Sequence, residues 1–125
     1  MEEGTGIYRT KDSLASSADK IRELQERVAD VAVTDPSLTF NTEVTAAIEL
    51  TYMLDGAETI IHSALSRTES RGSHQRSDHP DRDDENFIQH SLAYREPNGP
   101  PRIEYTPVSI TRWPPGDRVY GQKKD

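Results

Sequence analysis

Proline is distributed very unevenly along this sequence, and that distribution limits what each half can fold into. Only Pro36 precedes Pro80, and the other seven of the eight prolines lie at or beyond residue 80. Because proline has no backbone N–H and a fixed φ, it is disfavoured inside helices and inner strands. The first half is therefore predicted to be helical, and the second half extended, rich in turns and wrapped on another surface.

A first helix is predicted from about Asp12 to Val31. Its apolar residues recur at steps of three and four, which places them on one face: Leu14, Ala18, Ile21, Leu24, Val28 and Val31. Either Asp12 or Ser13 is expected to cap its start. The helix is expected to end before Pro36, because the residue before a proline avoids the helical conformation.

A second helix is predicted to begin near Asn41 or Thr42 and to run to about Arg67–Ser70. Its apolar residues form one continuous face: Ala46, Ala47, Leu50, Met53, Leu54, Ala57, Ile60, Ile61, Ala64 and Leu65. Gly56 is the position at which this long helix could divide into two. Two helices alone cannot bury both faces, so a third element is expected.

The second half contains a predicted β-hairpin. Its strands are Phe87 to Arg95 and Arg102 to Tyr105, joined by a Pro97-Asn98-Gly99 turn. The apolar residues of both strands are expected to share one face: Ile88, Leu92, Tyr94, Ile103 and Tyr105. Pro107 limits the following strand, 108–110, to an edge, and Trp113-Pro114-Pro115-Gly116 begins an extended tail.

These elements predict a mainly α fold: a helical hairpin or incomplete three-helix bundle, then a small β-hairpin and an extended proline-rich C-terminal tail. Three regions are expected, a helical part over 1–70, a charged linker or docking loop over 71–86, and the hairpin with its extension over 87–125. Hydrophobic residues make up only 32% of the chain against 30% charged. The chain is therefore short of core, and both helices are expected to keep an exposed apolar flank.

The charge balance removes several classes of function. The 15 lysines and arginines face 22 aspartates and glutamates, which gives a net charge of -7 and argues against binding to nucleic acid or to an anionic membrane. With no cysteine, the chain has no disulfide or thiolate metal site. The N-terminus resembles no signal peptide and no segment is apolar enough to cross a membrane, so a soluble, unprocessed chain is expected.

The most densely charged stretch, 69–85, admits four interpretations. A metal site is disfavoured because the spacing fits no zinc or calcium pattern and four arginines repel a cation; its ligands would come from His74, Asp78, His79, Asp81, Asp83 and Asp84. A catalytic pair of His74 with Asp78 has no evident nucleophile beside it. A solvated loop is the plain alternative. We favour an arginine network that clamps another part of a protein, with Gly72 allowing the close approach.

Three further features carry weaker signals. Gly4-Thr5-Gly6 is half of a dinucleotide-binding fingerprint, but Arg9 stands where the third glycine belongs, so a turn is expected instead. His62 and His90 stand alone in a predicted helix and strand. Both are expected to be hydrogen-bonded structural histidines rather than ligands.

A set of short motifs runs through the chain from residue 2 to about 121, and the most distinctive is Arg67-x-Glu69-Ser70-Arg71-Gly72-x-His74-x-Arg76. The others are Glu3-Gly4-x-Gly6-Ile7-Tyr8-Arg9-Thr10, Leu24-Gln25-Glu26-Arg27, Phe40-Asn41-Thr42-Glu43, Ile48-Glu49-Leu50, Arg82-Asp83-Asp84-x-Asn86-Phe87, His90-x-Leu92-Ala93, Glu104-Tyr105 and Pro114-Pro115-x-x-Arg118-Val119-Tyr120-Gly121. In order and spacing they resemble the C-terminal part of the fumarate reductase flavoprotein subunit, within the succinate dehydrogenase and fumarate reductase flavoprotein family.

This resemblance implies a helical C-terminal domain of a subunit that moves hydride between FAD and succinate or fumarate. The family's FAD-binding and substrate-binding residues lie upstream, so no catalytic, cofactor-binding or metal residue is assigned in this chain, and FAD belongs to the complete subunit. Whether the chain by itself is an enzyme stays open. The residues expected to dock the domain onto the rest of the subunit are Glu69, Arg71, Gly72, His74, Arg76 and Arg82.

The resemblance also implies partners and a location. The partners are the chain's own upstream FAD-binding domain, the iron–sulfur subunit and, indirectly, the membrane anchor subunits, with no nucleic acid and no direct membrane insertion. The expected location is cytoplasmic, peripheral on the inner face of the cell membrane. The alternative is a free-standing helical interaction module derived from that family, without redox activity.

Overall fold

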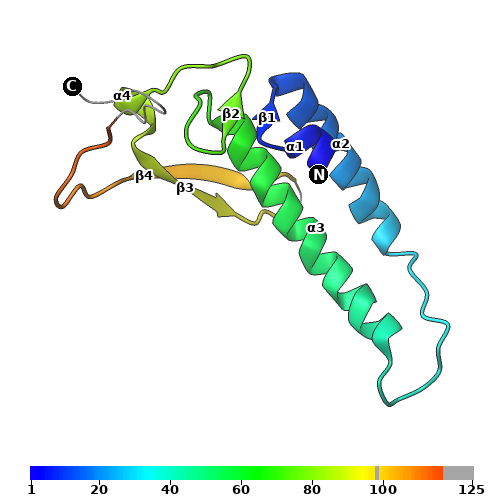
Figure 1. Ribbon diagram of the computed structural model, residues 1–125. Helices are drawn as coiled ribbons and strands as arrows, with labels where there is room; N and C mark the ends of the chain where they lie inside the picture. Colours follow the sequence, from blue (N-terminus) through cyan, green and yellow to red (C-terminus); the bar gives the residue numbers. More distant parts are fainter. Residues whose placement is uncertain (98, 117–125) are drawn as a thin grey trace, which may run out of the picture.

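The computed structural model describes residues 1–97 and 99–116. Figure 1 shows two long antiparallel helices that form a hairpin, with the short strands gathered at one end and the connecting loop at the other. The elements in chain order are α1 (Glu2–Thr5), β1 (Tyr8–Arg9), α2 (Lys11–Val28), α3 (Thr42–Ser66), β2 (Gln75–Arg76), α4 (Asp84–Phe87), β3 (Gln89–Tyr94) and β4 (Arg102–Pro107). The prediction of a mainly helical chain with a small β-hairpin is confirmed, in its helical-hairpin form.

The first predicted helix is α2, and its start differs from the prediction. Thr10 is the N-cap instead of Asp12 or Ser13: its hydroxyl accepts a hydrogen bond from the Ser13 N–H at 3.2 Å, and Ser13 Oγ accepts one from the Thr10 N–H at 3.0 Å. This reciprocal pair satisfies two N–H groups that no helical carbonyl can reach. The helix ends at Val28, three residues before the predicted end.

The second predicted helix is α3, and its predicted limits are close to the observed ones. Asn41 is the N-cap, and its side-chain oxygen accepts a hydrogen bond from the Val44 N–H at 3.1 Å. The helix runs unbroken through Gly56, so the possible division there does not occur.

The core is small and lies between α2 and α3. Ile21, Leu54 and Ile61 form its buried centre, and partly buried neighbours complete it: Ala18, Leu24, Val28, Ala57 and Leu65. The predicted apolar face of α3 is wider than the stripe that is buried, because Met53 and Ile60 remain exposed. The exposed apolar flank expected on both helices is therefore present on α3, whereas no large apolar side chain of α2 is exposed.

The β-hairpin pairs β3 with β4 in a register that corrects one prediction. Ile103 lies opposite Ala93 and Tyr105 opposite Ser91, so Leu92 and Tyr94 point to the other face, where both are exposed. Opposite residues of an antiparallel pair share a face, and the inner face is therefore Gln89, Ser91, Ile103 and Tyr105 rather than the predicted apolar set. Phe87, predicted as the first strand residue, belongs to α4.

One pairing is absent from the sequence predictions. β1 and β2 are parallel, with Tyr8 opposite Gln75 and Arg9 opposite Arg76, and they tie the start of the chain to the segment after α3. Residues 108–116 carry neither helix nor strand, and the remainder of the predicted tail, like Asn98 of the predicted turn, lies outside the described residues. Within the described ranges no helix is long and apolar enough to span a bilayer.

Two adjacent isoleucines of α3 test this description of the core. Ile61 is fully buried and Ile60 is 55% exposed. Replacing Ile61 by alanine should lower the free energy of unfolding by about 2–4 kcal/mol, because it leaves a cavity between the helices. Ile60→Ala removes the same atoms and should cost less than about 1 kcal/mol. Urea unfolding followed by circular dichroism measures both, and equal losses would contradict this core.

Candidate functional site

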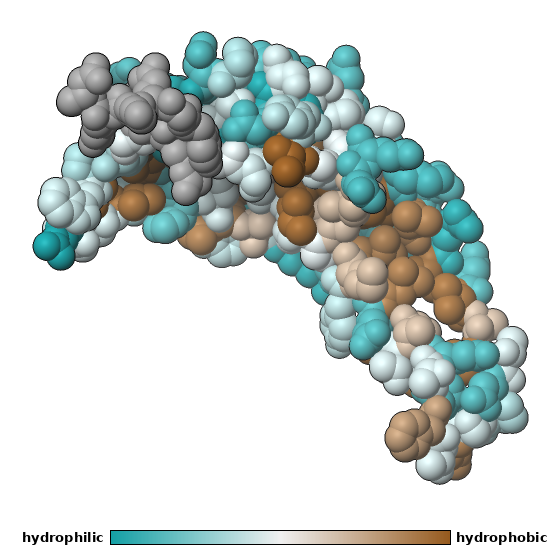
Figure 2. Space-filling view, in the orientation of Figure 1, coloured by the Kyte–Doolittle hydropathy of each residue, from teal (hydrophilic) through white to brown (hydrophobic). Residues whose placement is uncertain are grey.

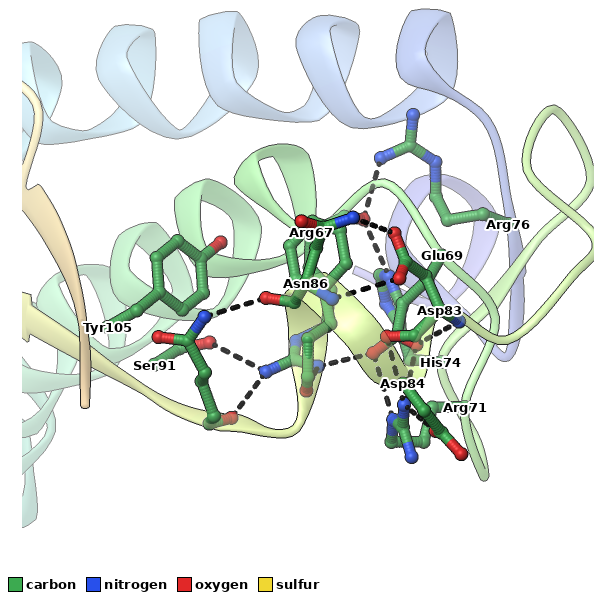
Figure 3. A network of polar contacts seen from close by, with 12 residues as sticks. Arg67, Glu69, Arg71, His74, Arg76, Asp83, Asp84, Asn86, Ser91 and Tyr105 are labelled. Carbon is green, nitrogen blue, oxygen red and sulfur yellow. Dashed lines mark hydrogen bonds and ion pairs between the residues drawn. The ribbon is translucent and has the colours of Figure 1, made fainter. Parts of the chain in front are cut away.

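The charged residues after α3 gather at one end of the helical hairpin and hold one another in place. We call this set the base network: Arg67, Glu69, Arg71, His74, Arg76, Asp78, Arg82 and Asp84. Figure 3 shows most of them converging between the end of α3, the loop that follows it and the start of β3. Of the side chains that the structure describes, none leaves a buried nitrogen or oxygen without a hydrogen-bond partner.

Glu69 is the acidic centre of the base network and is fully buried. Its carboxylate accepts hydrogen bonds from Arg67, from Arg71 Nε and Nη2, both at 2.9 Å, and from the Asp83 N–H at 2.9 Å. Burial alone would raise the pKa of Glu69, but the bonds from Arg71, Asp83 and Arg67 outweigh it and hold the pKa below its ordinary value. The carboxylate is therefore ionised and organises the loop around it.

Arg67 connects the end of α3 to the β-hairpin. Its guanidinium donates to the carbonyls of Phe87 at 2.9 Å and Gln89 at 2.6 Å. It also lies 5.2 Å from the centre of the Phe87 ring and 5.9 Å from that of Tyr105, close enough for cation–π attraction. One side chain thus fixes the position of β3 and β4 against the helix.

Arg76 closes the C-terminal end of α3. It is 1% exposed, and its Nη1 donates to the carbonyls of Ala64, Leu65 and Arg67 at 3.2, 3.4 and 3.2 Å. The last carbonyls of a helix have no partner within the helix and carry its negative dipole end. Arg76 supplies both the missing donors and the positive charge.

Asp78 extends this link to the start of α2. Its two carboxylate oxygens accept from Arg76 Nε and Nη2 at 2.7 and 2.8 Å, and Oδ2 also accepts from the Lys11 N–H at 2.9 Å. The Arg76 guanidinium holds the pKa of Asp78 far below its usual range. A carboxylate at a helix N-terminus is favourable for the same dipole reason that favours the arginine at the C-terminus of α3.

His74 has a structural role in the same cluster and is not paired with Asp78. Its Nε2 lies 3.0 Å from the Arg67 carbonyl, which can only accept, so this nitrogen carries the proton. Burial, together with the nearby positive charges of Arg9, Arg76 and Arg67, lowers the pKa of His74. The considered acid–base pair of His74 and Asp78 does not form, because each group is bound to another partner.

The outer part of the base network is less enclosed. Arg71 and Arg82 both form ion pairs with Asp84, at 2.7 and 2.8 Å, and each arginine side chain is 29% exposed. Gly72 has φ +59°, and a Cβ placed on it would meet no atom within 4 Å. The glycine is required here by the left-handed backbone and not by crowding within this chain.

All six residues predicted to dock the domain lie in or beside the base network: Glu69, Arg71, Gly72, His74, Arg76 and Arg82. The structure adds internal partners to each charged member. Three residues of the cluster were not among the predicted set, namely Arg67, Asp78 and Asp84. No local signal identifies the role of Arg67, because the carbonyls it binds, those of Phe87 and Gln89, lie about 20 residues further along the chain.

Among the described residues the possible metal ligands do not gather into a cluster, and the partial dinucleotide fingerprint serves packing. No group of three or more potential metal ligands occurs among residues 1–97 and 99–116. The two glycines of the partial dinucleotide fingerprint serve internal packing: a Cβ on Gly4, in α1, would collide with Ser17 of α2, and one on Gly6 would lie 2.7 Å from the Glu2 carbonyl oxygen. These two glycines therefore form no phosphate cradle.

A cavity of about 670 Å³ lies between α2, α3 and the end of the β-hairpin. His62 lines it together with Asp55 and Glu58. Both acids already have partners, since Asp55 faces Arg95 at 3.9 Å and Glu58 accepts from Gln25 at 3.1 Å. The cavity is a surface hollow of mixed polar and apolar lining, and these two acids are paired within the chain.

The contribution of the Arg76 contacts to the free energy of unfolding can be measured by replacing Arg76 with methionine. Arg76→Met keeps the stem but removes the hydrogen bonds to the carbonyls of Ala64 and Leu65 and the positive charge beside Asp78, so the free energy of unfolding should fall by about 3–5 kcal/mol. Arg22→Met removes an exposed arginine that pairs with Asp19 and should cost less than about 1 kcal/mol. Thermal and urea unfolding compare the two; similar costs would show that Arg76 is dispensable.

His74 should make stability depend on pH between about 7.5 and 5.5. Because folding lowers its pKa below the ordinary value near 6.5, the unfolded chain binds a proton that the folded chain refuses, and stability falls as pH drops below about 6.5. His74→Gln preserves a donor for the Arg67 carbonyl and should flatten this part of the curve. Parallel melting-temperature curves for the two proteins would refute the assignment; the paired carboxylates contribute only at lower pH.

With this geometry in view, the comparisons with known proteins are specific. Residues 1–120 match the family model described as "Fumarate reductase flavoprotein C-term". The chain is 54% identical over 122 residues to the fumarate reductase flavoprotein subunit of Mycobacterium tuberculosis, and the match covers 98% of this chain and 21% of that protein. The corresponding subunit of Escherichia coli is 50% identical over 127 residues, with 100% of this chain and 21% of that protein covered.

Solved structures give the same result. A chain of an E. coli quinol fumarate reductase variant superposes with a TM-score of 0.91 at 49% identity, covering 99% of this chain and 22% of that one. A quinol-fumarate reductase with menaquinol molecules superposes at 0.84 and 49% identity, covering 91% of this chain and 20% of that one. The chain thus spans about a fifth of the length of the relatives it matches. It belongs to the fumarate reductase flavoprotein C-terminal family.

Proposed function

We propose that this chain serves as the C-terminal domain of a flavoprotein subunit that interconverts fumarate and succinate with FAD. Its own part is structural: it packs on the FAD-binding domain of the subunit and presents a surface to the iron–sulfur subunit. The observation that carries the proposal is the match of residues 1–120 to the C-terminal family model, together with flavoprotein subunits that are half identical to this chain.

The contacts of the base network favour a structural role for this domain over a catalytic one. Its buried charges are all paired within the chain, and catalytic groups need a free proton or lone pair aimed at a substrate. Glu69 and Arg76 are enclosed and already occupied. FAD supplies the hydride chemistry of such subunits when bound, and in this proposal it binds outside residues 1–125, where the substrate site also lies.

The docking surface of this proposal is the open side of the base network. Arg71 and Arg82 are held in place by Asp84 yet remain partly exposed, so their orientation is set before a partner arrives. Gly72 lies beside Arg71 with empty space around it, which permits a close backbone approach. Glu69, His74 and Arg76 act from beneath by fixing the loop that carries these groups.

In this proposal the domain remains outside the lipid bilayer, on the inner face of the cell membrane, and meets the membrane anchor subunits only through the iron–sulfur subunit. The lack of a membrane-spanning helix in the part of the chain that the structure describes is consistent with that position. The net charge of -7 also disfavours direct contact with anionic lipids.

The function is tested with the complete flavoprotein subunit that carries this chain, purified with its iron–sulfur subunit. The preparation should contain FAD, oxidise a reduced viologen dye when fumarate is added, and run in the reverse direction with succinate and an electron acceptor. A preparation loaded with FAD that acts on neither compound would overturn the proposed function.

Gly72 offers a test of the docking surface. Gly72→Asn adds a side chain that tolerates positive φ and meets nothing in this chain, so the stability of the domain itself should change by less than about 1 kcal/mol. In the complete subunit the added side chain should obstruct the neighbouring domain, and limited proteolysis should release the C-terminal part several-fold faster. Gly99→Asn, also in open space but on the β-hairpin, is the control. Cleavage of Gly72→Asn at the wild-type rate would place the docking surface elsewhere.

A further inference from the structure

The free end of the helical hairpin is a second surface with an unusual construction. We call it the hairpin tip, residues 30–48, which comprise the loop between α2 and α3 and the first turns of α3. Figure 1 shows this loop projecting away from both sheets, at the opposite end of the hairpin from the base network. Nothing else in the described chain covers it.

The hairpin tip exposes apolar side chains. Leu38 and Phe40 are 103% and 97% exposed, as open as residues in a free peptide. Four more apolar residues of the hairpin tip are exposed to more than 40%, namely Val31, Val33, Val44 and Ile48. Beside them, an apolar groove of about 370 Å³ runs between the two helices and is lined chiefly by Leu24, Val28, Val31, Leu50 and Leu54. Figure 2 shows apolar surface along this arm of the molecule.

Polar contacts, and not apolar packing, hold the loop in shape. The Glu43 carboxylate accepts hydrogen bonds from the N–H groups of Thr34 and Asp35 at 2.7 and 3.1 Å and from the Thr34 hydroxyl at 3.1 Å. The Asn41 side chain donates to the carbonyls of Asp35 and Ser37 at 2.8 and 3.0 Å. The loop is therefore ordered while its apolar side chains stay free, and such preorganisation reduces the entropy lost on binding.

Phe40 has an unfavourable backbone conformation, and no contact of its side chain with the described residues compensates for it. Its φ is +56°, in the left-handed region, where a bulky aromatic residue is a genuine outlier. Glycine or asparagine would adopt this conformation more easily, and the exposed ring makes no packing contact that could offset the strain. Strained residues of this kind concentrate at functional sites.

The charges around the hairpin tip indicate which partner fits it. From Val28 to Ser66 the sequence contains six acidic residues and no lysine or arginine. Within the hairpin tip these are Asp30, Asp35 and Glu43. A second copy of the same surface, or an anionic lipid headgroup, would be repelled. We propose that the hairpin tip docks into an apolar pocket, rimmed by lysine or arginine, on a separate protein chain of the same complex, with Phe40 as the anchoring side chain.

The position of the hairpin tip favours a separate chain over the rest of the same subunit. This step rests on the proposed function, in which the base network faces the FAD-binding domain. The part of α3 beyond the hairpin tip, residues 49–66, separates the two surfaces by roughly 27 Å at ~1.5 Å per residue. Two surfaces at opposite ends of a rigid hairpin are suited to contact two different bodies.

A photo-crosslinker at position 40 of the complete flavoprotein subunit identifies the partner. Benzoylphenylalanine replaces Phe40, the assembled complex is purified and irradiated, and the joined peptides are sequenced by mass spectrometry. We expect one dominant crosslink, to a peptide of another subunit in which apolar residues lie beside lysine or arginine. A crosslink to the same subunit, to a second hairpin tip or to lipid, or no crosslink, would overturn the proposal.

The contribution of the ring is measured with Phe40→Asn in the same complex. Asparagine relieves the positive φ, so the melting temperature of the 125-residue chain should be unchanged or raised, while dissociation of the partner subunit should accelerate about tenfold or more, as for a hot-spot side chain. Trp113→Asn removes an aromatic ring that is 77% exposed outside the hairpin tip and should leave dissociation unchanged. Unchanged dissociation for Phe40→Asn would overturn the proposal.

These results are separable from a failure of the proposed function. The FAD content and the fumarate turnover of the same preparation report on the function, and the crosslink from position 40 does not depend on turnover. An active complex without a crosslink would refute the docking of the hairpin tip alone. An inactive complex with a crosslink to another subunit would support docking and refute the activity.

Discussion

The ion pair between Arg76 and Asp78 is the contact on which the arrangement of this chain depends. Arg76 donates to the last carbonyls of α3 and Asp78 accepts from the first N–H of α2, so a single ion pair caps the adjacent ends of two antiparallel helices. Each charge also opposes the dipole end it meets. The small apolar core packs the two helices together along their length, and the ion pair joins their ends.

The buried charges of the base network select one conformation for the loop after α3, in a chain that has little apolar surface to bury. Replacing a buried ion pair by well-packed apolar residues is often neutral or stabilising, so the base network is not explained by stability alone. The geometry of the base network explains its presence better. Glu69 accepts hydrogen bonds from two arginines and a backbone N–H, and Arg67 binds the β-hairpin through the Gln89 carbonyl. The loop after α3 is thereby held in one shape without a hydrophobic interior of its own, and a partner meets a preformed surface.

The helices could be predicted from the sequence, because their signals are local. The strand register and the ion-pair partners could not, because they depend on residues far apart in the chain. Helices α2 and α3 follow from apolar spacing and from Asn41, signals contained within a few turns. The register of β3 on β4 could not be found in this way, because the inner face holds Gln89 and Ser91, which Arg67 and α4 engage, and alternation of apolar residues pointed to Leu92 and Tyr94 instead. Arginine-rich motifs identified the base network as a unit, but which arginine serves which carboxylate depends on the folded backbone.

The parallel pairing of β1 with β2 has a consequence for how the chain acquires its shape during synthesis. Tyr8 meets Gln75, and the Lys11 N–H meets Asp78 from 67 residues away. The start of α2 therefore leaves the ribosome long before Asp78, whereas its Thr10 cap lies in the same segment and is made with it. Contacts this distant in sequence slow folding, because the intervening loop must close first. The base network can therefore close only after α2, α3 and the loop that follows α3 have all been synthesised.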